Sequence, residues 1–308
     1  MKKSAYIITR PLQYINATNI EDENLKDCYL EDNFNSFELF VSNIRSKSNY
    51  WDKVYTCKTK QLGLFKIILN RRKYSKVYLD SDLGILLRIS LILLFPLKIY
   101  VYEEGFASYT AEYRGKKTFR DIILTAIDKI LCGKNWSGGS ARTQGIYLYQ
   151  KHAFRKIVSD TTSKEMLDFK SKFSDHLVSI PEINFLFKGI DFELFRDKEV
   201  LLYISSWTIN NKLKEYIDKY PKHIKIIKPH PHIKEFSFDN DYFEHIIENM
   251  LNAEIVILEI MKVCKELIII HEGSAAMLTF KNSLKLKEYN INTPENRLKY
   301  DELKEMFV

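Results

Sequence analysis

A lysine and a histidine follow an apolar run in the sequence Lys228-Pro229-His230-Pro231. Ligands of open α/β sheets bind beyond the carboxyl ends of strands, so a strand that ends here would place both side chains beside an anionic ligand. The two prolines restrict the backbone around His230, whose imidazole can donate a hydrogen bond to a phosphate or protonate a leaving group. A proline-rich turn with incidental histidines is the alternative interpretation.

Two adjacent carboxylates, Glu103 and Glu104, follow a second apolar run and precede Gly105. Like charges disfavour ionisation, so neighbouring carboxylates in a cleft raise each other's pKa. One of the two can then act as a general base near neutral pH. A solvated acidic turn is the alternative.

A third apolar run leads into the segment His271 to Ala275. Gly273 allows close approach of the backbone to a ligand, and Ser274 can cap a following helix. Free amides at that helix start would suit a phosphate, although an ordinary helix cap has the same sequence pattern. Ser205 and Ser206 follow a further strand and are candidates for the same pocket.

Asp80-Ser81-Asp82 indicates a competing chemistry. An Asp-x-Asp after a strand can hold Mg²⁺ or Mn²⁺ together with a nucleotide diphosphate. The alternative is a helix start capped by Ser81 or Asp82. The metal-dependent interpretation gives no role to the histidines at the other strand ends.

Apolar patterns predict the elements that position these residues. The expected strands cover 5–9, 37–41, 51–55, 76–79, 97–102, 146–149, 200–204, 224–228, 252–257, 266–270 and 284–286. Helices are expected at 14–20, 62–71, 83–94, 119–131, 209–220, 258–264, 275–279 and 295–307, and after the capping box Thr162-x-x-Glu165. This alternation predicts an α/β protein with two doubly wound, Rossmann-like domains facing a cleft, residues 1–190 and 191–308, with the boundary inside 184–198.

The composition is that of a soluble globular protein, with 308 residues, 45% hydrophobic and 28% charged. A formal net charge of +7 suggests anionic partners, although a lysine-rich proteome explains it equally well. The four scattered cysteines form no Cys-x-x-Cys pair and favour a reducing cytosol. The apolar start breaks at Arg10-Pro11, unlike a signal peptide, and the stretch 83–101 is too interrupted to span a bilayer.

Taken together, four motifs resemble glycosyltransferase family 52, the bacterial lipooligosaccharide sialyltransferases, and more distantly the bacterial polysialyltransferases. They occur in the family's order over nearly the whole chain: Thr9-Arg10-Pro11-Leu12-Gln13, Glu103-Glu104-Gly105, His230-Pro231, and Ser274 within His271-Glu272-Gly273-Ser274. Each motif is short, so their order and their positions at strand ends carry the resemblance. Arg10 before Pro11 and the Asp80-Ser81-Asp82 stretch depart from the family pattern.

The resemblance implies a GT-B fold and metal-independent, inverting transfer of sialic acid from CMP-sialic acid to a galactosyl acceptor. It implies that Glu103 is the base, with Glu104 the runner-up, and that His230 contacts the CMP phosphate. His271, Gly273 and Ser274 would surround the nucleotide. The carboxyl-terminal domain would then bind the donor, with Lys228, Pro231 and Ala275 nearby, and the amino-terminal domain would bind the acceptor.

Two other functions remain as alternatives. One is a metal-dependent transferase that uses a UDP-sugar through Asp80 and Asp82. The other is a basic, non-enzymatic protein that binds glycans or nucleic acid, although no nucleic-acid motif is present. The leading hypothesis needs no cofactor beyond the CMP-sugar and expects no nucleic-acid partner. It places the protein in the cytoplasm, where the positive charge suggests contact with the inner membrane. The acceptor, the linkage, the choice between sialic acid and other CMP-activated acids, and a homodimeric state stay open.

Overall fold

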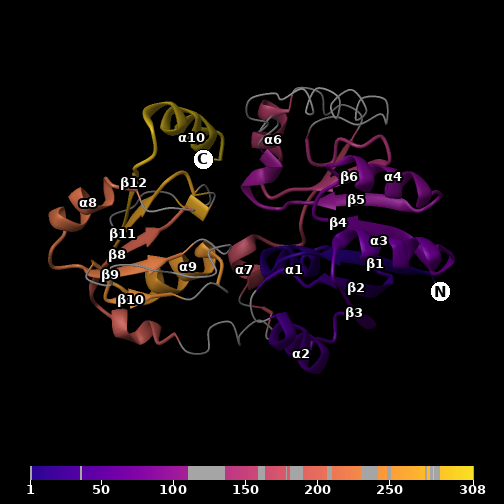
Figure 1. Ribbon diagram of the computed structural model, residues 1–308, viewed down its shortest axis with the longest axis horizontal. Helices are drawn as coiled ribbons and strands as arrows, with labels where there is room; N and C mark the ends of the chain where they lie inside the picture. Colours follow the sequence, from indigo (N-terminus) through magenta and orange to yellow (C-terminus); the bar gives the residue numbers. More distant parts are fainter. Residues whose placement is uncertain are drawn as a thin grey trace. The chain divides into compact units, whose positions relative to one another are not determined.

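The computed structural model describes residues 2–34, 37–109, 136–158, 164–177, 179–180, 190–206, 210–229, 242–247, 251–274, 276–277, 280 and 285–307. The chain divides into two compact units, Met1–Ile183 and Asn184–Val308 (Figure 1). This division falls at the edge of the range in which the sequence predicted a boundary.

Unit 1 contains a seven-stranded, fully parallel sheet with the order β3-β2-β1-β4-β5-β6-β7. Its strands are β1 (Lys3–Ile8), β2 (Leu25–Glu31), β3 (Lys53–Cys57), β4 (Tyr74–Leu79), β5 (Lys98–Tyr102), β6 (Thr143–Tyr147) and β7 (Glu165–Leu167). The chain first builds outward from β1 to β3 and then returns to build from β4 on the other side. This is the Rossmann order, and its switch point lies between β1 and β4.

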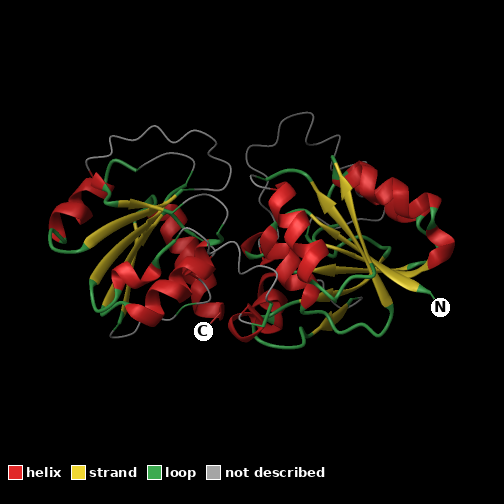
Figure 2. Cartoon of the chain, turned by 90° about the horizontal axis from the view of Figure 1, so that it is seen from below, coloured by secondary structure: helices red, strands yellow, loops and turns green. Residues whose placement is uncertain are grey.

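Helices lie on both faces of this sheet (Figure 2). They are α1 (Pro11–Thr18), α2 (Phe37–Lys47), α3 (Lys60–Leu69), α4 (Ile85–Leu93), α6 (Lys151–Ile157) and α7 (Phe173–Leu177), with short 3-10 turns η1 (Arg71–Lys73) and η2 (Phe106–Tyr109). Side chains alternate between the two faces of each strand. On β1, Ala5 and Ile7 therefore share an apolar core with Leu64 of α3 and Leu91 of α4.

The opposite face of the same sheet is aromatic. Tyr6, Tyr78 and Tyr100 occupy neighbouring strands and stack in sequence, with ring centroids 4.3 Å and 5.4 Å apart. Trp51 contacts the Tyr6 ring edge-on at 5.2 Å, and its indole nitrogen donates to the hydroxyl of Tyr14 in α1. Large aromatic side chains combine extensive apolar area with a polar atom that needs a partner, and Trp51 satisfies both demands here.

Unit 2 contains a five-stranded parallel sheet with the order β10-β9-β8-β11-β12. The strands are β8 (Glu199–Ile204), β9 (Ile224–Lys228), β10 (His245–Ile246), β11 (Glu266–His271) and β12 (Leu286–Asn290). The helices are α8 (Leu213–Lys219), α9 (Ala253–Val263) and α10 (Pro294–Phe307), with a 3-10 turn η4 (Phe192–Phe195). The switch point lies between β8 and β11. The predicted fold class, α/β with two doubly wound domains, is confirmed.

Two predicted strands are helices. The segment 37–41 begins α2, whose buried residues Phe37, Phe40, Val41 and Ile44 follow the helical spacing i, i+3, i+4, i+7. The β-branched segment 252–257 belongs to the first half of α9, which extends over eleven residues to Val263. In both cases a short apolar run was interpreted without the residues that continue its helical period.

Three further strands, β2, β7 and β10, were not predicted. β2 was missed because its polar residue Asp27 interrupts the apolar pattern, yet Asp27 is buried and accepts a hydrogen bond from the Tyr74 hydroxyl at 2.9 Å. The capping box expected to start a helix instead leads into β7, which begins at Glu165. The helix predicted for 119–131 lies outside the described residues.

Candidate functional site

Three neighbouring strands of unit 1 end in polar residues at one edge of the sheet. Thr9 follows β1, Asp80 follows β4 and Glu103 follows β5. Neighbouring strands are about 4.8 Å apart, so these side chains lie close together. The Thr9 hydroxyl donates to Oδ2 of Asp80 at 2.7 Å, and Lys60, at the start of α3, pairs with the same carboxylate. Lys60 also donates to the Ser81 carbonyl at 2.8 Å.

Glu103 is a buried connection between elements. Its Oε2 accepts a hydrogen bond from the Tyr109 hydroxyl at 2.5 Å and from the Tyr149 amide at 2.9 Å. Its backbone carbonyl accepts one from Nδ2 of Asn16 at 2.7 Å. These contacts join the end of β5 to η2, to the segment after β6 and to α1, which is a structural role.

Glu104 has a different environment. It is partly exposed, and among the described residues none donates a hydrogen bond to its carboxylate. Burial raises its pKa to about 7, the Asp80 carboxylate contributes further, and Lys60 and Arg10 act in the opposite direction. The sequence attributed such a shift to repulsion between Glu103 and Glu104, whereas the structure identifies burial first and Asp80 second. A carboxylate with a pKa near 7 can accept a proton at neutral pH and release it again.

Asp80 and Asp82 bind to different parts of unit 1. Asp82 is fully buried and accepts hydrogen bonds from the amides of Gly138 and Ser140, at 2.8 and 2.9 Å, and from the Thr143 hydroxyl at 2.6 Å. None of these groups bonds to Asp80 among the contacts of the described residues. The described residues also contain no cluster of three or more His, Cys, Asp or Glu side chains arranged to hold a metal ion. Asp82 thus anchors the loop that precedes β6.

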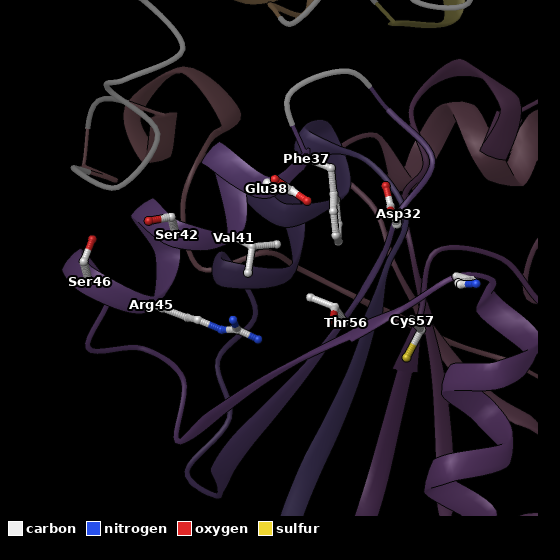
Figure 3. A pocket seen from close by; sticks show the side chains of 10 residues that line it. Asp32, Phe37, Glu38, Val41, Ser42, Arg45, Ser46, Thr56 and Cys57 are labelled. Carbon is white, nitrogen blue, oxygen red and sulfur yellow. The ribbon is translucent and has the colours of Figure 1, made fainter.

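A pocket of about 760 Å³ opens beside α2 at the ends of β2 and β3. Figure 3 shows Phe37 and Val41 of α2 pointing toward Thr56 of β3, and Arg45 nearby donates to the Val54 carbonyl at 3.1 Å. β3 lies four strand positions from β5, or about 19 Å at the usual strand spacing. The pocket is therefore separate from Glu104.

In unit 2 the neighbouring strands β9, β8 and β11 end in Lys228, Ile204 and His271, and Ser205 follows β8. Lys228 is 2% exposed, and its ammonium donates to the Pro229 carbonyl at 2.8 Å. Burial lowers its pKa to about 8, against the attraction of Glu254 at the start of α9. The amide of Ser205 donates to the Lys228 carbonyl at 3.1 Å, which joins the two strand ends. His230, Pro231 and Ala275 lie outside the described residues.

His271 is fully buried and organises the turn after β11. Its Nδ1 accepts hydrogen bonds from the amides of Gly273 and Ser274, both at 2.9 Å, so the proton of the neutral ring is on Nε2, 2.8 Å from Oε1 of Glu288. Burial lowers the pKa of His271 to about 3, and nearby Lys304 contributes. The imidazole thus occupies the amides of Gly273 and Ser274. The helix expected to offer free amides to a phosphate starts at Ala275, outside the described residues, so that expectation stays a prediction.

The strand ends were predicted from the sequence. The side chains from other elements that contact the residues at those ends were not. Nothing local to Glu103 indicates Tyr109 or Tyr149 as its partners, and Lys60 reaches Asp80 from another element. No role at the site was predicted for Arg10, yet its charge acts on Glu104. The glycines were a usable signal: Gly105 and Gly273 have φ values of 103° and 87°, where a side chain would be strained.

Comparison of the sequence with protein-family profiles and with curated proteins gives no match. The structure is similar to that of UDP-GlcNAc 2-epimerase from Neisseria meningitidis bound to UDP-GlcNAc, with a TM-score of 0.51 and 11% identity over 99% of this chain and 94% of that one. It is also similar to the wall teichoic acid polymerase TagF soaked with CDPG, with a TM-score of 0.51 and 10% identity over 99% and 80% of the chains. At such identities the likeness concerns the fold alone, and it supports the GT-B type of fold.

Proposed function

We propose that this protein is an inverting glycosyltransferase that moves sialic acid from CMP-sialic acid to a galactosyl acceptor of a bacterial surface glycan, lipooligosaccharide or capsule. The observation that carries the proposal is the Glu104 carboxylate, which is partly exposed at the carboxyl end of β5 and has a pKa raised to about 7. The GT-B type of fold and the order of the four sequence motifs support it.

Glu104 is the base in this proposal, in preference to Glu103. A general base must reach the proton that it removes and must be ionised when it does so. Glu103 uses Oε2 to hold Tyr109 and Tyr149, so protonating it would disturb two structural hydrogen bonds. Among the described residues no donor binds the Glu104 carboxylate, and about half of the molecules have it ionised at pH 7. As it removes the acceptor proton, the acceptor oxygen forms a bond to the anomeric carbon of the donor.

The bond that breaks joins the anomeric carbon to the CMP phosphate, so the leaving group is an anion. Lys228 supports its departure, because a pKa of about 8 leaves this buried ammonium mostly charged at pH 7. A cation in a dry site stabilises developing negative charge more strongly than it would in water. Ser205, Ser206 and His230 complete the donor site in this proposal. His271 acts through the turn at Gly273 and Ser274, which it holds in place.

These assignments give the donor to unit 2 and the catalytic base to unit 1. They require no metal ion, because the positive charge comes from side chains. The three buried free cysteines of the described residues, Cys28, Cys57 and Cys264, agree with a reducing compartment, and we place the protein in the cytoplasm.

Nucleotide release tests the proposal. CMP-Neu5Ac and a panel of UDP-sugars are each incubated with the protein and lactose, with and without EDTA. The proposal predicts CMP release that EDTA does not affect and that Glu104→Gln abolishes in a folded protein. Release of UDP only in the presence of a divalent metal would instead support the alternative chemistry of Asp80 and Asp82.

A further inference from the structure

One surface of unit 1 exposes large apolar side chains from two adjacent helices. The α3–α4 surface consists of Leu62, Phe65 and Leu69 of α3 and Leu86, Ile89 and Leu93 of α4, which are between 42% and 69% exposed. The residues of each helix follow a spacing of three or four, so they form one stripe on each helix. The two helices contact each other, which brings the stripes together (Figure 1).

These side chains are additional to the core, because each helix is apolar on both sides. Leu64 and Ile67 of α3, with Leu87 and Leu91 of α4, already pack against the sheet. A helix on the surface of a soluble protein normally turns polar residues outward. Single exposed leucines are ordinary, whereas a contiguous apolar surface marks a place where something binds.

Within residues 60–98, every exposed charged side chain is basic. Residues 60–98 contain only two acidic side chains, Asp80 and Asp82, and both are buried. Arg71, Arg72 and Lys73 are exposed directly after α3, and Nη1 of Arg71 donates to the Leu93 carbonyl at the end of α4, at 3.2 Å.

A further cation, Arg142, lies at the same end of the α3–α4 surface. The guanidinium of Arg142 lies over the exposed ring of Phe95, 5.2 Å from its centroid. Phe95 follows α4 directly, and Lys98, at the start of β5, is exposed nearby in the sequence. Apolar side chains bordered by cations are the combination that enters the interface of an anionic bilayer.

We propose that the α3–α4 surface binds an anionic lipid membrane, with the apolar side chains at the boundary between headgroups and acyl chains and the cations on lipid phosphates. A second copy of the chain would bring like charges together, which disfavours self-association through this surface. α4 has nine residues and is about 13 Å long, far shorter than the roughly 30 Å of a bilayer core. No helix in the described part of the chain is long and apolar enough to cross a membrane.

Both helices start at the sheet edge that carries the candidate base. Lys60 in the first turn of α3 pairs with Asp80, and α4 follows the segment that begins at Asp80. Membrane binding would therefore hold this edge near a lipid-linked acceptor, a consequence that rests on the proposed function. The binding itself does not, because it involves neither donor nor base.

Vesicle flotation of the full chain tests the proposal. We expect binding to vesicles of phosphatidylcholine with 40% phosphatidylglycerol at low salt, and at least tenfold weaker binding to pure phosphatidylcholine. The double variant Phe65→Ser, Leu86→Ser should lower partitioning at least tenfold, and Arg72→Gln, Lys73→Gln should remove most of the preference for the anionic lipid. All four positions are exposed, so circular dichroism and thermal unfolding should match the wild type.

The matched control is Leu298→Ser on α10, where a leucine that is 62% exposed lies outside the surface. It should partition like the wild type. Equal binding of the Phe65, Leu86 variant and the wild type would overturn the proposal. The proposal would also be overturned if the wild type did not bind vesicles and instead sedimented as a dimer that the Phe65, Leu86 substitutions dissociate. Donor turnover without lipid is unaffected in either case, which separates this test from that of the proposed function.

Discussion

Replacing Glu104 with glutamine should stabilise the protein and abolish its activity at the same time. The carboxylate is held where its charge is unfavourable, since its pKa is raised from 4.5 to about 7 by burial and by Asp80. Each pKa unit corresponds to about 1.4 kcal/mol, so the ionised form of Glu104 costs the folded state about 3 kcal/mol above pH 7. Glutamine has nearly the same shape and cannot ionise.

The size of this stabilisation depends on pH. Between pH 4.5 and 7 the folded state binds a proton that the unfolded state releases, so the wild type loses stability as the pH rises through this range. The free energies of unfolding of variant and wild type should therefore differ little at pH 4.5. The variant should be more stable by about 3 kcal/mol at pH 8, an order-of-magnitude figure from the same shift.

Urea unfolding followed by circular dichroism at pH 5, 6, 7 and 8 measures the difference. Glu103→Gln is the matched control and should have the opposite sign, because it disturbs hydrogen bonds from Tyr109 and Tyr149 and should lose about 1–3 kcal/mol at every pH. A constant difference between Glu104→Gln and the wild type across this range would refute the assignment of a raised pKa to Glu104.

Four further predictions follow from the same contacts. The kcat/KM for transfer should rise about tenfold per pH unit up to about pH 7, as Glu104 ionises, and fall again above about pH 8, as Lys228 loses its proton; a flat profile would exclude Glu104 as the base. Asp82→Asn should lower the free energy of unfolding by about 2 kcal/mol and leave the activity per folded molecule unchanged, whereas loss of activity restored by added Mn²⁺ would assign Asp82 to a metal site. The folded pKa of His271 lies near 3, below the unfolded value of 6.5, so this residue should lower the free energy of unfolding by about 1.4 kcal/mol for each pH unit below 6.5. Denaturation measured between pH 4 and 6 should show a free energy of unfolding that depends less on pH in His271→Gln than in the wild type. Lys228→Met should raise the KM for the nucleotide sugar in the folded protein, because it removes the buried positive charge; an unchanged KM would remove Lys228 from the donor site.

The strand ends were predictable because they depend on local sequence. β9 covers 224–228 as predicted, and its apolar run ends where Pro229 cannot continue the ladder. Gly105 and Gly273 adopt the left-handed backbone that marks sharp turns after β5 and β11. Because the strands are parallel, their carboxyl ends lie at the same edge of the sheet. Asp80 and Glu103 follow the neighbouring strands β4 and β5 and therefore lie at one edge.

The roles of the residues at those ends depended on contacts across the fold. The motif Glu103-Glu104 does not show which carboxylate is held by hydrogen bonds, because the donor Tyr149 lies 46 residues from Glu103 in the sequence. The pattern at Gly273 and Ser274 does not show that the imidazole of His271, itself part of the motif, accepts hydrogen bonds from both amides. The exposed stripes of α3 and α4 were not predicted, since apolar content alone does not distinguish a core from a binding surface.

The most direct test of the proposed function is mass-spectrometric detection of the product formed from CMP-Neu5Ac and a labelled galactoside, with wild-type protein, Glu104→Gln and Glu103→Gln at pH 7.5. We predict a sialylated galactoside from the wild type and from the folded fraction of Glu103→Gln, and none from Glu104→Gln. Product from Glu104→Gln at the wild-type rate would contradict the assignment of the base. Transfer from UDP-sugars alone would contradict the assignment of the donor.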